Sequence, residues 1–176
     1  MSIDFFLDDI DTDNLDGYDS VAEGRYHFSV AGVEFNERGT LVLDCEVLAG
    51  TVPGQEGKVH REYFNAPNEN SKPGVKKRFL QLALATGIVT KDQLDQIKQS
   101  GQPFSPDWNL MVGRQFCGEV TIEEYVANDG TTKSSAKLGF NIWSLQSPKA
   151  QGIPLASTFT EGEEGGADDP FAGVPL

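Results

Sequence analysis

The pattern of apolar and polar positions marks five strand-length segments in the chain. Apolar and polar residues alternate with a period of two in residues 24–35, 40–48, 58–64, 115–126 and 135–143, which predicts strands with one buried face. Turn-forming residues separate the first two segments at positions 36–39 and the last two at positions 128–130. We therefore expect a hairpin at each of these two places.

The same alternation predicts which side chains fill the interior. For the first, fourth and fifth segments the predicted interior residues are Tyr26, Phe28, Val30, Val120, Ile122, Leu138, Phe140 and Ile142. The opposite faces of these segments present Arg25, His27, Lys137, Asn141 and Trp143. In the second segment one face carries Leu41, Leu43, Cys45 and Val47. The third segment leaves its inward face open, because Val59, Arg61 and Tyr63 alternate with His60, Glu62 and Phe64.

Between the third and fourth segments the apolar period changes to that of a helix. Pro73 suits the first turn of a helix and Gly87 suits its C-cap, and the residues at helical spacing between them are Val75, Phe79, Leu82 and Ala83. Thr90 and Gln93 have the spacing of a capping box and predict a second helix. The predicted order is therefore three strands, two helices and two strands.

This order of elements is that of a mainly β, five-stranded oligonucleotide-binding barrel, the OB-fold. A length of 176 residues suits one domain with terminal segments. We expect an acidic N-terminal segment at residues 1–20, the OB-fold domain at 21–146 and a flexible acidic tail at 147–176. The Gly, Glu and Pro content of the tail favours disorder.

The charge of the chain is unevenly distributed. The formal net charge is −13, but 12 of the 27 acidic residues lie in residues 1–20 and 147–176, which leaves 15 acidic and 13 basic residues in between. A nearly neutral domain can present one basic face if its basic residues converge. The candidates are Arg61, Lys72, Lys76, Lys77 and Arg78. An ordinary solvated helix face is the alternative interpretation of this cluster.

Other residues give no sign of catalysis. Asp44 with Glu46, and Glu123 with Glu124, are paired carboxylates, but solvated strand faces explain them better than a metal site does. Cys45 and Cys117 have no partner at ligand spacing and are predicted to be buried free thiols. We expect a protein that is not an enzyme and needs no metal or cofactor. Without a signal peptide or an 18-residue apolar run, it is expected in the cytoplasm.

Several short motifs together resemble a family of small phage-encoded proteins from replication and recombination modules. The motifs lie at residues 4–6, 23–26, 54–58, 61–65, 77–80, 84–87 and 110–114. Members of that family were long described as of unknown function and are thought to be OB-fold single-stranded-DNA-binding proteins. The resemblance covers residues 1–145 and implies the same fold and ligand here, in the cytoplasm of a phage host.

The end of the tail resembles the acidic tip of bacterial single-stranded-DNA-binding proteins. In those proteins aspartates precede a Pro-Phe pair that recruits partners, and here the matching residues are Asp168, Asp169, Pro170 and Phe171. Five residues follow Phe171, whereas Phe is the last residue in those proteins. The resemblance implies that replication or recombination proteins bind this tail. A merely solubilising tail is the alternative.

Together these patterns predict a protein that coats and protects single-stranded DNA with little sequence preference. Bases stack on aromatic side chains for about 1 to 3 kcal/mol each, and Lys and Arg contact phosphates. The predicted nucleic-acid-binding residues are Arg25, Arg61, Tyr63, Lys72, Lys76, Lys77, Arg78, Arg114, Tyr125, Lys137 and Trp143. For each aromatic residue, core packing is the alternative.

Two other functions are consistent with the composition. An acidic DNA mimic would occupy the basic groove of a nucleic-acid-processing enzyme, and a protein-interaction module would scaffold or inhibit one. A mimic needs its acidic residues spread over the folded surface, whereas here 12 of the 27 lie in the terminal segments. That distribution favours acidic tails over a mimic body.

Overall fold

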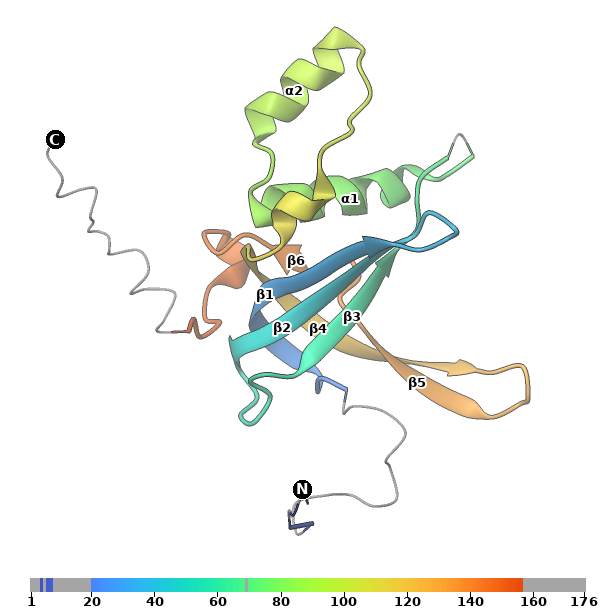
Figure 1. Cartoon of the computed structure of the whole chain (residues 1–176), viewed down its shortest axis with the longest axis vertical. Coiled ribbons are helices and arrows are strands. Elements are labelled where there is room, and N and C mark those ends of the chain that lie inside the picture. Colours follow the sequence, from blue (N-terminus) through green and yellow to red (C-terminus); the bar gives the residue numbers. More distant parts are fainter. Residues whose placement is uncertain (1–3, 5, 8–19, 69, 157–176) are drawn as a thin grey trace, which may run out of the picture.

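The computed structural model describes residues 4, 6–7, 20–68 and 70–156, and it is mainly β (Figure 1). An antiparallel sheet of six strands is joined by two α-helices that follow the third strand. The strands are β1 (Gly24–Phe35), β2 (Leu41–Gly50), β3 (Val59–Phe64), β4 (Gln115–Val126), β5 (Thr132–Lys137) and β6 (Ile142–Trp143). The helices are α1 (Pro73–Thr86) and α2 (Lys91–Ser100), with short 3-10 turns η1 (Trp108–Met111) and η2 (Pro148–Ala150).

Strand β1 lies at the centre of the sheet. The strand order is β3-β2-β1-β4-β5, and β6 pairs separately with β4. The predicted β1–β2 and β4–β5 hairpins are both confirmed. In the described residues no ladder joins the two edge strands β3 and β5, so the sheet is open. None of the helices there is long and apolar enough to cross a membrane.

Most of the predicted interior residues form the core. Tyr26, Phe28, Val30, Val120, Leu138 and Ile142 are all buried. The rings of Phe28 and Phe116 stack with centroids 5.3 Å apart, which links β1 to β4. Cys45 and Cys117 are confirmed as buried free thiols, and burial raises the pKa of Cys117 to about 11.

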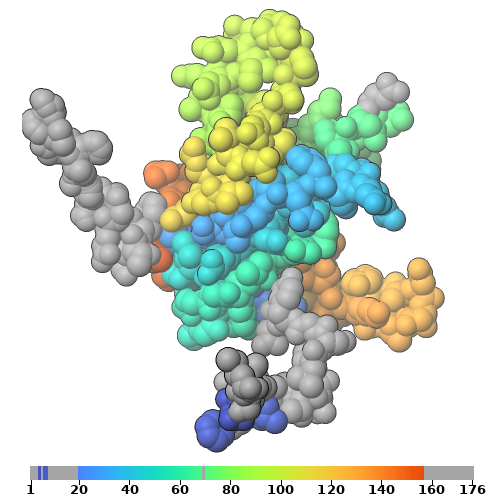
Figure 2. Space-filling view, viewed as in Figure 1, coloured from blue at the N-terminus to red at the C-terminus, as the bar shows by residue number. Residues whose placement is uncertain are grey.

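Two of the predicted interior residues were wrong, and both lie around the last hairpin. Phe140 is 51% exposed and Ile122 is 40% exposed. The predicted strand 135–143 is divided into β5 and β6 by a turn at Gly139, whose φ of +58° ends the alternation before Phe140. Ile122 pairs with Ala136 near the start of the β4–β5 ladder. The hairpin formed by β4 and β5 projects from the rest of the sheet (Figures 1 and 2).

The structure also settles the inward face of β3. His60, Glu62 and Phe64 are buried, whereas Tyr63 is 54% exposed and Arg61 is exposed. Two polar side chains therefore point into the protein from an edge strand. Such burial is costly unless hydrogen bonds compensate for the lost water.

Both predicted helices form with the predicted caps. Pro73 occupies the first turn of α1, and Gly87 ends it with a φ of +78°. The buried face of α1 includes Phe79, whose ring lies 5.7 Å from that of Phe64 on β3. Thr90 and Gln93 form the predicted capping box of α2. Helix α2 buries none of its residues and projects beyond α1 (Figure 1).

The described residues after position 146 pack on the sheet, up to Ala156. Ala150 and Ile153 are buried against Cys117, with Trp143 packed beside them. The backbone N–H of Ala156 donates to Nδ1 of His27 at 3.0 Å. His27 was predicted on the face opposite the core, but it is fully buried. Residues 147–156 therefore belong to the folded domain.

A buried carboxylate connects the edge strand β3 with the turn after β5. Glu62 is 6% exposed, and its oxygens accept hydrogen bonds from the backbone N–H groups of Leu138 at 3.0 Å and Gly139 at 3.1 Å. His60 Nε2 and Arg78 Nη2 each lie 2.7 Å from the same carboxylate. Side chains therefore link the two edges that no strand pairing joins.

The pKa of Glu62 reflects this set of donors. Burial by itself raises the pKa of the carboxyl, but the hydrogen bonds from His60, Leu138 and Gly139 lower it by more. The pKa therefore lies below its ordinary value of 4.5. Glu62 is ionised at neutral pH and holds Arg78 by charge as well as by geometry.

Glu62→Gln should destabilise the protein by about 2 kcal/mol at neutral pH, because the partly buried Arg78 would lose its charged hydrogen-bond partner. Urea unfolding measures the loss. Glu124→Gln, at an exposed position of β4, is the matched control and should change stability by less than about 0.5 kcal/mol. Because the folded pKa lies below 4.5, the contribution of Glu62 is lost as pH falls through that folded pKa. A parent-to-variant difference that did not shrink in acid would contradict this assignment.

His27 should give the domain a second pH dependence. Burial lowers the pKa of His27 from 6.5, with the hydrogen bond to Gln115 opposing the shift. The unfolded chain therefore takes up the proton first, and the stabilisation by neutral His27 is lost as pH falls from 6.5 to the folded pKa. His27→Asn should remove that slope from urea-unfolding energies. If His27→Asn kept the same pH dependence of the unfolding free energy, the dependence would not come from His27.

Candidate functional site

The predicted basic cluster separates into two kinds of residue. Lys72, Lys76 and Lys77 are exposed on the first turns of α1. Over residues 20–68 and 70–156, no ion pair engages any of these three lysines. Arg78 instead points inward to Glu62, and its guanidinium lies 4.3 Å from the ring centre of Phe64. Three exposed lysines, with Lys72 as the N-cap, and one arginine held by Glu62 therefore share the start of this helix.

Arg78 also brings two exposed aromatic residues together. Its guanidinium donates to the backbone oxygen of Tyr63 at 3.2 Å and to that of Gly139 at 3.1 Å. Tyr63 is 54% exposed, and Phe140, next to Gly139, is 51% exposed. A side chain placed on Gly74 of α1 would meet the Phe140 ring at 3.6 Å. Phe140 therefore lies against the first turn of α1.

We call Tyr63, Phe140, Lys72, Lys76 and Lys77 the β3–α1 surface. It combines two half-exposed rings near Arg78 with three lysines that make no ion pair in the part of the chain that the structure describes. The sequence analysis found every member except Phe140, which strand alternation assigned to the core. The glycine before Phe140 was the available signal, because a glycine with positive φ ends a strand.

Arg61 does not bind Glu62 and lies on the outer face of β2 and β3. Its Nε and Nη2 atoms bind the Asp44 carboxylate at 2.7 and 3.0 Å. Glu34 and Glu46 lie on the same face by strand register. The positive charge of Arg61 is thus matched by neighbouring acids, and Asp44 is engaged by a cation. Among the described residues, no group of three or more His, Cys, Asp or Glu side chains could hold a metal ion.

Two predicted residues lie on the projecting β4–β5 hairpin. Tyr125 is 50% exposed and faces Lys133 across the hairpin. Lys137 binds Glu123 at 2.8 Å, and this hydrogen bond raises the pKa of Lys137. Figure 2 shows the hairpin standing away from the body of the protein. The hairpin is therefore a separate group of candidate residues.

The remaining three predicted residues lie away from the β3–α1 surface. Arg25 donates to the backbone oxygens of Lys149 and Gln151 and lies 5.5 Å from the Trp143 ring centre. Trp143 packs in turn against the cluster of Cys117, Ala150 and Ile153. These two residues hold the C-terminal segment in place. Arg114 is exposed beside Gly87, at the C-terminal end of α1.

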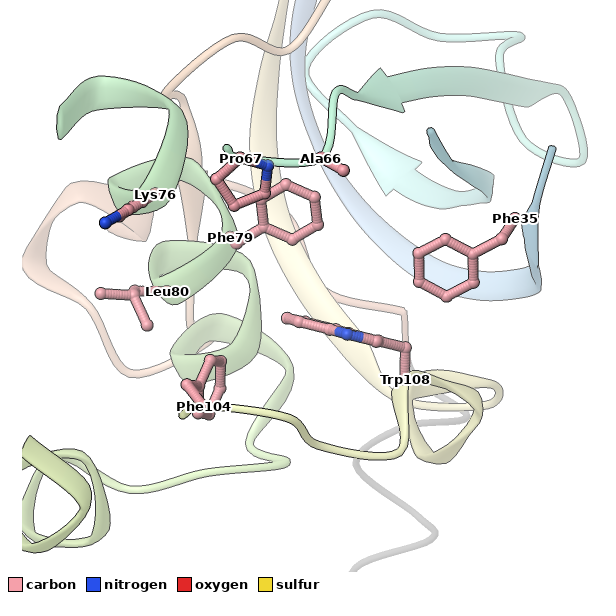
Figure 3. Close-up of a pocket in the computed structure, with 8 residues that line it drawn as sticks. All are labelled: Phe35, Ala66, Pro67, Lys76, Phe79, Leu80, Phe104 and Trp108. Atoms are coloured by element: carbon pink, nitrogen blue, oxygen red, sulfur yellow. The ribbon is translucent and has the colours of Figure 1, made fainter. Parts of the chain in front are cut away.

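A groove beside α1, which shares Lys76 with the β3–α1 surface, was not predicted from the sequence. It has a volume of about 450 Å³ and is lined chiefly by Phe35, Pro67, Lys76, Phe79, Phe104 and Trp108. The Trp108 ring meets those of Phe79 and Phe104 edge to face, at 5.4 and 5.8 Å. In Figure 3, Phe35 faces these rings across open space. We call this the α1 groove. Four separate chain segments form it, so no local pattern in the sequence predicts it.

The predicted partner-binding residues Asp168, Asp169, Pro170 and Phe171 lie outside the described residues, as does most of the acidic segment 1–20.

Comparison with known proteins identifies one family. A family model described as "Protein of unknown function (DUF669)" matches residues 8–113, which span the first three strands, both helices and η1. Comparison with curated proteins finds no match. Since the family model covers more than half of the sequence, the chain belongs to DUF669, a family of unknown function.

Proposed function

We propose that this protein is a non-catalytic, OB-fold single-stranded-DNA-binding protein of phage or prophage type. Its β3–α1 surface would hold the strand, and its acidic tail would recruit replication or recombination proteins. The observation that carries the proposal is the grouping, near Arg78, of two exposed rings and three lysines that form no ion pair with the described residues.

The strand order supports the OB-fold part of the proposal. In that fold a five-stranded, partly open Greek-key barrel binds oligonucleotides on its second and third strands. Here the order is β3-β2-β1-β4-β5, with α1 and α2 inserted between β3 and β4. Glu62 of β3 binds the backbone just after β5, so the two edges approach each other as they do in a barrel. We propose that this contact takes the place of strand pairing at the barrel's closure.

The chemistry of the β3–α1 surface suits a single strand better than a duplex. Exposed rings such as Tyr63 and Phe140 stack with bases, and a duplex hides those base faces. Lys72, Lys76 and Lys77 bind no carboxylate of the described residues and can release counterions from phosphates, whereas Arg61 and Lys137 already bind carboxylates. Stacking on base faces and contact with phosphates are open to every nucleotide, so we expect weak sequence preference.

The purified protein should bind single-stranded DNA more tightly than duplex, with an affinity that falls as salt rises. Tyr63→Ala and Phe140→Ala should each weaken binding by about 1 to 3 kcal/mol, because each removes one stacking ring. Fluorescence anisotropy with a labelled oligonucleotide measures both effects, and circular dichroism verifies folding.

Leu155→Ala is the matched control for these two variants. Leu155 is also apolar and is 42% exposed. It precedes Ala156, which binds His27 of β1, and so lies away from the β3–α1 surface. Its truncation should leave DNA affinity unchanged. Equal affinity for both forms of DNA would refute the proposal. If the Tyr63 and Phe140 variants fold and bind DNA like the parent, the β3–α1 surface is not the DNA-binding site.

The tail proposal needs a truncation placed by the structure. Because residues 147–156 pack on the sheet, the deletion should remove residues 157–176 only. The shortened protein should bind DNA at least as tightly, since five carboxylates that compete with phosphates are gone. It should also lose pull-down of replication or recombination proteins, with Phe171→Ala giving much of that loss. Weaker DNA binding would place the tail inside the DNA site, and unchanged pull-down would remove its recruiting role.

A further inference from the structure

We infer that the α1 groove is a nucleobase pocket, which takes one unstacked base of the DNA strand held on the β3–α1 surface. This inference rests on the proposed function and adds a second subsite to it. The base would enter between Phe35 and Trp108, and Lys76 at the rim would contact the adjacent phosphate.

The walls of the groove suit a flat aromatic ligand. Phe35 is 53% exposed at the end of β1 and faces Trp108 and Phe79 across the groove (Figure 3). Trp108 is fixed by its edge contacts with Phe79 and Phe104. One wall is therefore rigid, while the other is a ring with space to adjust. Aromatic walls of this kind stack with any base, because every base has a flat face.

The groove is also continuous with the β3–α1 surface. Pro67, which lines it, follows β3 by three residues, and Phe79 connects Phe64 of β3 to Trp108 through ring contacts of 5.7 and 5.4 Å. Lys72 and Lys76 are four residues apart and so lie on one side of the helix. A strand that leaves Tyr63 along α1 would therefore meet the groove next to these two lysines.

Charge and size favour a nucleotide over a protein partner. The lysines of the β3–α1 surface have no ion-pair partner among the described residues, which complements a phosphate backbone. The volume of about 450 Å³ lies within the range of small-ligand pockets, about 300 to 1,000 Å³. Eight residues line the groove, whereas a stable protein interface takes about 20 to 30 residues from each partner.

The test uses Trp108 as an internal reporter. The chain has two tryptophans, and Trp143→Phe leaves Trp108 alone while keeping an aromatic ring beneath Arg25. A labelled oligothymidylate of about 20 nucleotides, longer than one OB-fold site, is titrated into this variant. Anisotropy reports binding and Trp108 emission reports occupation of the groove. We expect Trp108 to be quenched in step with the rise in anisotropy.

Two variants of the otherwise unaltered chain test the same inference without the reporter. Phe35→Ala should weaken oligothymidylate binding by roughly fivefold or more, the loss expected for one stacked base. Lys76→Gln should weaken binding and reduce the salt slope by about one. Lys98→Gln, which removes the same charge from the exposed face of α2, is the control and should bind like the parent.

The outcomes separate this inference from the proposed function. If the oligonucleotide binds but either Trp108 emission or the affinity of Phe35→Ala is unchanged, the groove is not a base site and the β3–α1 surface stands alone. If nothing binds, the proposed function fails and the inference fails with it. If a peptide of residues 161–176 quenches Trp108 and the oligonucleotide does not, the groove takes an acidic peptide, which also overturns the inference.

Discussion

The ion pair between Glu62 and Arg78 holds the architecture together. Glu62 lies on an edge strand, Arg78 lies on the helix that follows, and the carboxylate also binds two backbone N–H groups beyond β5. Among the described residues no ladder pairs β3 with β5, so this contact links the two edges of the sheet. Removing Arg78 would leave the Glu62 carboxylate buried without its cation, which costs more than the pair itself contributes. The link between the two edges therefore depends on a few polar atoms.

The ion pair between Glu62 and Arg78 also separates the roles of the neighbouring basic residues. Arg78 offers several donors in a rigid plane and can bind Glu62 and two backbone oxygens at once. The lysines before it have flexible stems and compact charges, which suit a surface that contacts a moving phosphate chain. A cluster that looks uniform in the sequence is thus divided into a structural arginine and exposed lysines. This division places Tyr63 and Phe140 beside the lysines.

The C-terminal segment shows a related constraint at the opposite end of β1. Arg25 and His27 contact residues 149–156 through backbone atoms, so the folded domain extends beyond its last strand. His27 must be neutral to accept the hydrogen bond from Ala156 at Nδ1. The packing of this segment is therefore coupled to protonation, whereas the β3–α1 surface is coupled to the ionisation of Glu62. The two ends of the domain respond to acid in different pH ranges.

The sequence by itself determined the elements whose signals are local. The bounds of β1 and β4, the caps of α1 and α2 and both hairpins follow from alternation, turn residues and capping spacing. It also identified the three lysines of the β3–α1 surface and one of its two rings, Tyr63. Tertiary structure decided the inward face of β3, because burying His60 and Glu62 requires donors from Arg78, Leu138 and Gly139. It likewise exposed Phe140, through the turn at Gly139, and assembled the α1 groove from four separate segments. Contacts between distant residues leave no periodic trace in a sequence, because each segment keeps its own local pattern whichever partner it meets.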